Sequence, residues 1–313
     1  MKTDFVKPES NYYLAANLTI ISLLAVFASF LILVPEKIPA SKELAMKMII
    51  LATLSISFIS SIRLIKTKQM RALLQTVFVV LFFGYFYGYS SDFQFIVHNK
   101  WQDDKIVALD KTLFGGEVSM LAEKIMTPYI TEVMMFSYIF YFPLLFIVAF
   151  VAYKSTSEKG LGEYLSILSL GIAFCHFGFI LFPVASQMYY LPEQYSVILQ
   201  GGWFTYLGEL IRSNAHFPGG SLPSPHCTIG TVMILILRKN NRTVFYIILP
   251  FVLLLYASTV CCRYHYIWDC IIGIILGFFL VKAFPFFQKA LEMLSLFIKC
   301  ILHPVSFSQS LSD

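Results

Sequence analysis

The residues that could most directly carry out chemistry are a histidine and an aspartate late in the chain. The segment "STVCCRYHYIWD" places His265 four residues before Asp269. On a helix, this spacing puts both side chains on one face, where they can touch. A carboxylate bonded to one ring nitrogen fixes the tautomer and raises the basicity of the other nitrogen. The pair is therefore either the orienting half of a nucleophile or general-base arrangement, or a structural His–Asp pair near a membrane surface.

A second histidine, His226, follows the turn-rich segment "PGGSLPSPH". Ser224 suits an N-cap and Pro225 suits the first helical position, so we predict that a helix begins here. The free N–H groups and the positive dipole at such an end bind phosphate well. Gly219 and Gly220 would let the backbone approach a ligand closely. The alternative is a turn that carries a surface histidine.

Taken together, these groups favour a phosphoryl-transfer pocket made of two histidines, an aspartate, basic side chains and a helix N-terminus. A metal site is the competing interpretation, because two histidines and a carboxylate can ligate zinc or iron. Arg263 lies two residues before His265. Its positive charge favours an anion over a cation as the ligand.

The composition identifies the setting of these residues. Of 313 residues, 58% are hydrophobic and 13% are charged, whereas a soluble domain has about 45–50% apolar and about 25% charged residues. We therefore predict an all-α, polytopic membrane helix bundle. The net charge of +5 is spread along the chain and does not support a nucleic-acid partner. The six cysteines show no CxxC or zinc spacing, which indicates apolar packing residues.

Apolar runs long enough to span a bilayer, about 20 residues each, position the candidate residues. We predict eight spans: Leu14–Val34, Ala45–Ile65, Ala72–Phe93, Tyr129–Tyr153, Tyr164–Ala185, Cys227–Leu237, Val244–Cys262 and Trp268–Phe284. The sixth is short, but it can extend back through His226 and forward to Arg238. We expect a two-helix membrane extension over residues 1–71, a catalytic membrane domain with a six-helix core over 72–284, and an interfacial helix and tail over 285–313.

Basic residues orient these spans. Lysines and arginines follow spans two, four, six and eight, and with eight spans all four segments fall on one side. The positive-inside rule makes that side cytoplasmic, together with both termini. The span ends that carry His226, His265 and Asp269 then lie at one depth on the opposite face, towards a periplasm, lumen or cell exterior. Segment 92–128 mixes acids, bases and a Gly-Gly break, which indicates helical pieces on the membrane surface.

The two polar segments resemble signatures of the type-2 phosphatidic acid phosphatase superfamily. One signature is Pro-Ser-x-His preceded by Pro-Gly-Gly, as in residues 218–226. The other is His-x-x-x-Asp with a serine seven residues before the histidine, as at Ser258, His265 and Asp269. Thr259 stands where the common phosphatases have arginine, so the chain is most similar to the branch that contains inositol phosphorylceramide synthases. "LDKTLFG" (109–115) and "LFPVASQMYY" (181–190) resemble further elements of that branch.

The resemblance implies a role for each residue. His265 would be the nucleophile that forms a phosphohistidine, Asp269 would orient it, and His226 would protonate the leaving group and later activate the acceptor. The family needs no metal and no cofactor. Phosphate oxygens would be held by basic side chains and backbone groups, at Arg263, Arg212, Ser224 and Gly220.

One position departs from the branch, which has a Pro-Arg pair where this chain has Gln187-Met188. A phosphate-binding arginine is therefore absent there, and Arg212 or Arg263 could substitute for it. The expected function is a lipid phosphatase if the acceptor is water, or a head-group phosphotransferase if the acceptor is a lipid hydroxyl. The expected partners are the bilayer and a membrane lipid with a phosphate or phospho head group.

Two other functions remain open. A transporter or channel would favour charges in mid-span or inverted repeats, but the polar residues here lie at span ends and no repeat is present. A catalytically inactive family member acting as a scaffold is the other alternative, prompted by Met188. The sequence leaves the lipid, the organism's membrane and the oligomeric state open.

Overall fold

A computed structural model describes residues 12–302 of the chain, without the side chains of Ala215 and residues 291–302. Its regular elements in that range are helices, and it has no strand there. The long helices are α1 (Leu14–Leu33), α2 (Ser41–Ser61), α3 (Lys68–Tyr87), α7 (Pro128–Thr156), α8 (Glu158–Leu181), α11 (Pro225–Asn240), α12 (Arg242–Cys261) and α13 (Ile267–Leu302). The shorter helices are α4 (Ser90–Phe93), α5 (Asp103–Phe114), α6 (Val118–Ala122), α9 (Gln187–Tyr190) and α10 (Trp203–Ala215). Single 3-10 turns are η2 (Pro35–Lys37), η3 (Ile62–Leu64), η4 (Glu123–Ile125) and η5 (Pro192–Gln194).

Within the described part of the chain, seven helices are long and apolar enough to cross a membrane. They are α1, α2 with η3, α3, α7, α8, α12 and the part of α13 up to Ala290. The predicted all-α, polytopic bundle is thereby confirmed, and the chain is a multi-pass integral membrane protein. The predicted sixth span corresponds to α11, which has only 16 residues.

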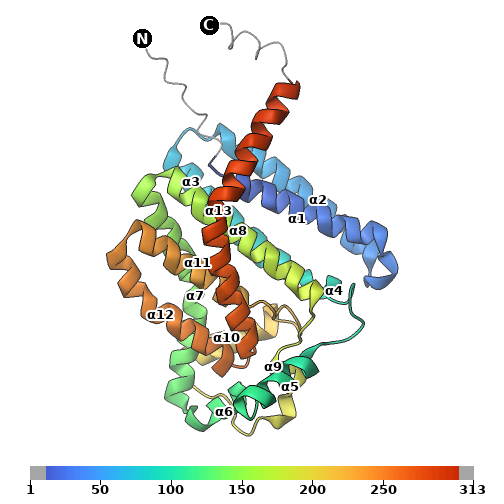
Figure 1. Ribbon diagram of the computed structural model, residues 1–313, viewed down its shortest axis with the longest axis vertical. Helices are drawn as coiled ribbons and strands as arrows, with labels where there is room; N and C mark the ends of the chain where they lie inside the picture. The colour runs from blue at the N-terminus through green and yellow to red at the C-terminus, as the bar shows by residue number, and fades with distance from the viewer. Residues whose placement is uncertain (1–11, 303–313) are drawn as a thin grey trace.

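Helix α11 lies at the centre of the bundle. It packs against α7, α8, α12 and α13, as Figure 1 shows. At 1.5 Å per residue it is about 24 Å long, less than the ~30 Å of a hydrocarbon core. Its neighbours shield it from lipid, which explains why a short helix can be buried there and why its apolar run looks weak as a span.

The N-terminal helices lie on one flank of this core. Helix α1 packs against α8 and against α2, and α3 also packs against α8 (Figure 1). A buried ion pair ties α3 to α8, because Arg71 Nη2 lies 2.5 Å from Glu158 Oε2. Tyr13, just before α1, donates its hydroxyl to Glu158 Oε1 at 3.3 Å. One carboxylate therefore anchors three helices at this end.

Two glycines on α13 set its distance from α11. A Cβ at Gly273 would lie 2.7 Å from the carbonyl oxygen of Ser224, and one at Gly277 would lie 2.6 Å from that of Thr228. Small residues four apart allow helix backbones to approach this closely. The contact aligns the start of α13, where Asp269 lies, with the start of α11.

The connecting segments are more helical than the sequence indicated. The predicted helical pieces in 92–128 are confirmed as α5, α6 and η4. Helix α10, in the segment 186–225, was not predicted. The third span is shifted towards the N-terminus, since α3 ends at Tyr87 and a separate turn, α4, covers Ser90–Phe93.

The tail and the charges complete the arrangement. Helix α13 runs without a break to Leu302, so most of the predicted interfacial segment continues the last span, and residues 303–313 lie outside the described residues.

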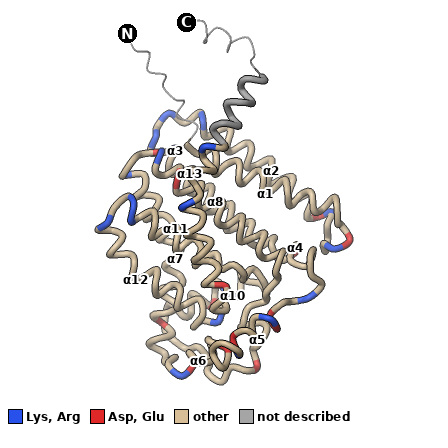
Figure 2. The backbone as a smooth tube through the Cα atoms, viewed as in Figure 1, with Lys and Arg blue, Asp and Glu red and all other residues tan. Residues whose placement is uncertain are grey.

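Figure 2 shows Lys and Arg positions at the α2–α3, α7–α8 and α11–α12 connections, at the end of the bundle away from α5 and α6. The end with α5 and α6 carries both signs of charge (Figure 2).

Candidate active site

His265 and Asp269 meet at the start of α13. Nδ1 of His265 lies 3.5 Å from Oδ2 of Asp269, and the two residues are 4% and 0% exposed. The expectation that they share a helical face is wrong in detail, because α13 begins at Ile267 and His265 lies in the preceding turn. The turn folds back because the N–H of Tyr266 donates to Asp269 Oδ2 at 3.0 Å. The same carboxylate oxygen therefore satisfies the turn and faces the imidazole.

The predicted start of α11 is confirmed. Ser224 is the N-cap, with its Oγ accepting from the N–H of Cys227 at 3.4 Å, and Pro225 is the first helical residue. The N–H of Ser224 donates to the carbonyl oxygen of Asp269 at 2.9 Å. This bond joins the beginnings of α11 and α13, which brings His226 beside His265.

His226 lies among aromatic rings. Its ring centroid is 5.8 Å from that of His265, 4.5 Å from Tyr138 and 4.6 Å from Tyr141. Its buried Nδ1 has no hydrogen-bond partner among the described residues. Buried polar atoms nearly always have a hydrogen-bond partner, so this nitrogen is a candidate to form a hydrogen bond with a bound substrate.

A third histidine, His216, also joins the site, and sequence reasoning did not single it out. It follows α10, its Nδ1 lies 3.0 Å from the hydroxyl of Tyr189, and its ring is 5.5 Å from that of Tyr264. Burial, with smaller contributions from the charges of His265 and Arg212, lowers the pKa of His216 to about 4. The ring is therefore neutral near pH 7. Its only sequence signal was its place in the polar stretch 212–226.

The two arginines expected to hold phosphate are each paired with a carboxylate. Arg263 Nη2 donates to Glu123 Oε1 at 2.9 Å and to the carbonyl oxygen of Val197 at 2.6 Å. Its guanidinium also lies 3.9 Å from the centroid of the Tyr195 ring. Arg212 Nη2 lies 2.5 Å from Glu209 on its own helix. Both guanidinium groups would have to share or exchange these partners to hold a phosphate.

The position where the arginine was expected is taken by neutral side chains. Gln187 is fully buried and its Nε2 donates to Glu117 Oε1. Met188 packs against the apolar core.

Gly220, the other expected phosphate-binding position, has φ of 65° and lies against Tyr87, whose hydroxyl oxygen would be 2.8 Å from an added Cβ. The loop 219–224 is thereby held against α3.

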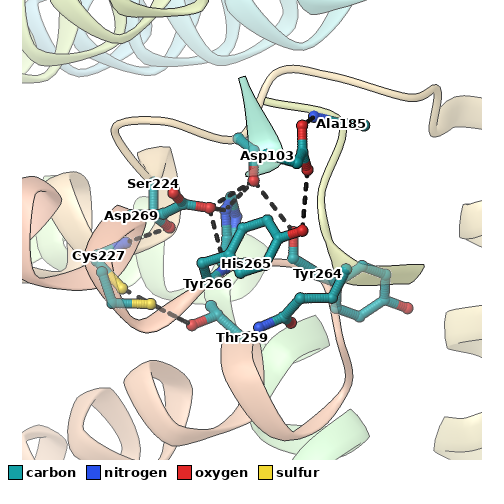
Figure 3. A network of polar contacts seen from close by, with 12 residues as sticks. Asp103, Ala185, Ser224, Cys227, Thr259, Tyr264, His265, Tyr266 and Asp269 are labelled. Carbon is teal, nitrogen blue, oxygen red and sulfur yellow. Dashed lines mark hydrogen bonds and ion pairs between the residues drawn. The ribbon is translucent and has the colours of Figure 1, made fainter. Parts of the chain in front are cut away.

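A buried carboxylate, Asp103, supports the site from α5. Its Oδ1 accepts from the Tyr266 hydroxyl at 3.0 Å and its Oδ2 accepts from the N–H of Ala185 at 2.9 Å. Figure 3 shows Tyr266 between Asp103 and Asp269. Burial raises the pKa of Asp103 to about 6, against the opposing effect of these two hydrogen bonds. No sequence pattern links Asp103 to residues so far along the chain.

No group of three or more His, Cys, Asp or Glu side chains that could hold a metal ion occurs among residues 12–302 with described side chains. The polar network around His265 is instead made of pairwise hydrogen bonds.

Comparisons with known proteins identify the family. The family model described as the PAP2 superfamily matches residues 104–283, which is more than half of the chain and includes His226, His265 and Asp269. Comparisons with curated proteins and with solved structures give no match. The seven candidate spans and the matched segment agree with the expected superfamily. The chain is therefore a multi-pass membrane protein that belongs to the type-2 phosphatidic acid phosphatase (PAP2) superfamily.

Proposed function

We propose that this protein transfers the phosphate or phospho head group of a membrane lipid through a phosphohistidine at His265. The observation that carries the proposal is the convergence of His265, a fully buried Asp269 and His226 at the beginnings of α11 and α13. Membership in a superfamily of phosphatases supports phosphoric ester chemistry. The buried, prearranged groups suit a reaction that develops charge in the transition state.

In the first step, Nε2 of His265 attacks phosphorus, an N–P bond forms and the P–O bond to the leaving group breaks. His226 gives a proton to the leaving oxygen. In the second step, water or a lipid hydroxyl loses a proton to His226 and attacks phosphorus, and the N–P bond breaks. Asp269 holds the imidazole of His265 in orientation throughout. General acid–base catalysis of this kind contributes about 10²–10⁴-fold.

The phosphate would sit at the start of α11, where the positive end of the helix dipole favours an anion. Ser224 and Gly220 lie in this loop. Arg212 and Arg263 would add charge only by sharing their bonds to Glu209 and Glu123. Such a site would hold the phosphate at the N-terminus of α11, with the arginines in supporting positions.

The proposed site faces away from the cytoplasm, with both termini on the cytoplasmic side. Support comes from the basic connections at the opposite end of the bundle (Figure 2) and from the positive-inside rule. Water as acceptor would make the protein a lipid phosphatase. A lipid hydroxyl would make it a head-group phosphotransferase, as in the inositol phosphorylceramide synthase branch that Thr259 favours.

A second candidate is a catalytically inactive superfamily member that acts as a scaffold. The observation that favours it is the pairing of Arg212 and Arg263 with carboxylates, together with neutral Gln187 and Met188. An inactive protein would retain the fold and the membrane lipid contacts but would release no phosphate.

The test uses detergent-purified protein with phosphatidic acid for phosphate release, and phosphatidylinositol with ceramide for head-group transfer. We expect the wild type to turn over one of the two, and His265→Ala and Asp269→Asn to lose that activity. His98→Ala, a histidine outside the site, is the control and should retain full activity. Full activity in both site variants would contradict the proposal, and an inert wild type on both assays would favour the scaffold.

A further inference from the structure

Ser221 contacts both His265 and Asp269, and the proposed reaction gives it no role. Its Oγ is 2.6 Å from Asp269 Oδ2 and 3.2 Å from His265 Nδ1, and the residue is 1% exposed. The direct His265–Asp269 distance is longer, at 3.5 Å. We propose that Ser221 is a positioning residue that links His265 to Asp269 and keeps Nε2 of His265 directed at phosphorus. This inference rests on the function proposed above.

The proton inventory gives the link a direction. A serine hydroxyl has one proton and two lone pairs, and an ionised carboxylate only accepts. At 2.6 Å, the contact between Ser221 and Asp269 lies in the range of a charge-assisted O–H···O⁻ bond. Ser221 therefore donates its hydroxyl proton in a hydrogen bond to Asp269. The alternative acceptor, the carbonyl oxygen of Tyr264, is farther away, at 3.4 Å. A lone pair of Oγ is then free to accept from His265 Nδ1–H.

This arrangement selects the reactive tautomer. With the proton on Nδ1 bound to Ser221, the lone pair of His265 is on Nε2, the nitrogen that attacks phosphorus in the proposed reaction. When the N–P bond forms, the ring becomes positive, and the negative charge of Asp269 acts on it through the polarised hydroxyl. The Asp269 carboxylate thus aligns the ring through two hydrogen bonds of Ser221 Oγ, one of 3.2 Å to His265 Nδ1 and one of 2.6 Å to Asp269 Oδ2. The direct contact between His265 Nδ1 and Asp269 Oδ2, at 3.5 Å, is weaker.

The backbone around Ser221 is fixed from two sides. The N–H of Gly219 donates to the carbonyl oxygen of Ala185 at 3.1 Å, and Gly220 lies against the Tyr87 ring with φ of 65°. On the other side, the N–H of Ser224 is bonded to the carbonyl oxygen of Asp269 at 2.9 Å. A hydroxyl held by a fixed loop can orient an imidazole, whereas a mobile one would lose that bond to water.

The test measures kcat and KM with phosphatidic acid or with phosphatidylinositol and ceramide, whichever the wild type turns over. We expect Ser221→Ala to lower kcat by about 10²-fold, the scale of a misplaced reacting group, with KM changed less than threefold. Ser137→Ala is the matched control, because Ser137 is also 1% exposed but donates to the carbonyl oxygen of Val133 in its own helix. It should retain the wild-type kcat.

A further comparison separates positioning from folding. Ser221→Thr keeps the hydroxyl and Ser221→Cys replaces it with a weak donor, so Thr should be the faster variant even if Ser221→Ala is poorly recovered. A wild-type kcat in Ser221→Ala, or equal rates for Thr and Cys, would overturn the inference.

Failure of the inference and failure of the proposed function give different results. If Ser221 has no positioning role, His265→Ala and Asp269→Asn remain inactive while Ser221→Ala works normally. If the proposed function is wrong, His265→Ala itself retains activity.

Discussion

The backbone N–H of Ser224 donates to the backbone carbonyl oxygen of Asp269 at 2.9 Å. This bond joins the N-cap of α11 to the first turn of α13, and it brings together two segments 45 residues apart in the chain. The ring centroids of His226 and His265 lie 5.8 Å apart. The relative position of the two histidines therefore depends on how closely α11 and α13 pack.

That dependence can be tested at Gly277. In Gly277→Ala the new Cβ would lie 2.6 Å from the carbonyl oxygen of Thr228, so the helices must separate. Overpacking of this kind costs about 1–3 kcal/mol, and we expect a lower thermal midpoint in detergent together with reduced turnover. Gly84→Ala is the control, since nothing lies within 4 Å of its added Cβ. Equal midpoints for the two variants would show that the close approach is unimportant.

The buried ion pair between α3 and α8 should stabilise the bundle without serving the chemistry. In Glu158→Gln, Arg71 loses the carboxylate that lies 2.5 Å away in a buried setting, and breaking such a pair costs about 3–5 kcal/mol. We expect a marked fall in thermal midpoint with unchanged turnover per folded molecule.

Glu163→Gln provides the matched control on the same helix. Its partner Lys239 has a 60% exposed side chain, and exposed pairs contribute about 0–1 kcal/mol. The midpoint of this variant should stay near that of the wild type. A larger loss in Glu163→Gln than in Glu158→Gln would contradict the ranking.

Asp103 should give stability a distinct pH dependence. Burial raises the pKa of Asp103 in the folded protein to about 6 from its ordinary value of 3.8, so the folded state binds the proton more tightly than the unfolded state. Between these two values the folded protein holds more protons, and the free energy of unfolding falls as pH rises. The stability of the wild type relative to Asp103→Asn should therefore be greatest near pH 4 and decline to a plateau above about pH 6.

Thermal midpoints of both proteins across about pH 4 to 7 check this sign. Asp103→Asn isolates the contribution of this one carboxyl, because other titrating groups, such as His216, are common to both proteins. A difference that grows with pH would show that Asp103 is charged and stabilised in the folded state.

Local chemistry made part of the site predictable from the sequence. The cap at Ser224 and Pro225 depends on adjacent residues, so it was predicted correctly. The contact between His265 and Asp269 was also predicted, but its geometry was not, because the chain makes a turn at His265 before α13 begins. Helix periodicity alone does not show where a helix begins within a short polar segment.

Contacts between distant segments were not predictable in the same way. Ser221 and Asp103 acquire their roles only in the folded chain, where the loop after α10 and the first turn of α5 contact the start of α13. The pairing of Arg263 with Glu123 joins residues 140 positions apart. Hydropathy placed the spans because lipid imposes a strong constraint, but no comparable rule assigns a partner to an arginine in a connecting segment.

The most direct measurement is the trapping of acid-labile phosphate with p-nitrophenyl phosphate, whose leaving group needs no proton. We expect wild type and His226→Ala both to become labelled at His265, with His226→Ala holding the label longer because acceptor activation is lost. His265→Ala should acquire no label. Label in His265→Ala equal to that in the wild type, or no label in either wild type or His226→Ala, would contradict a phosphohistidine at His265.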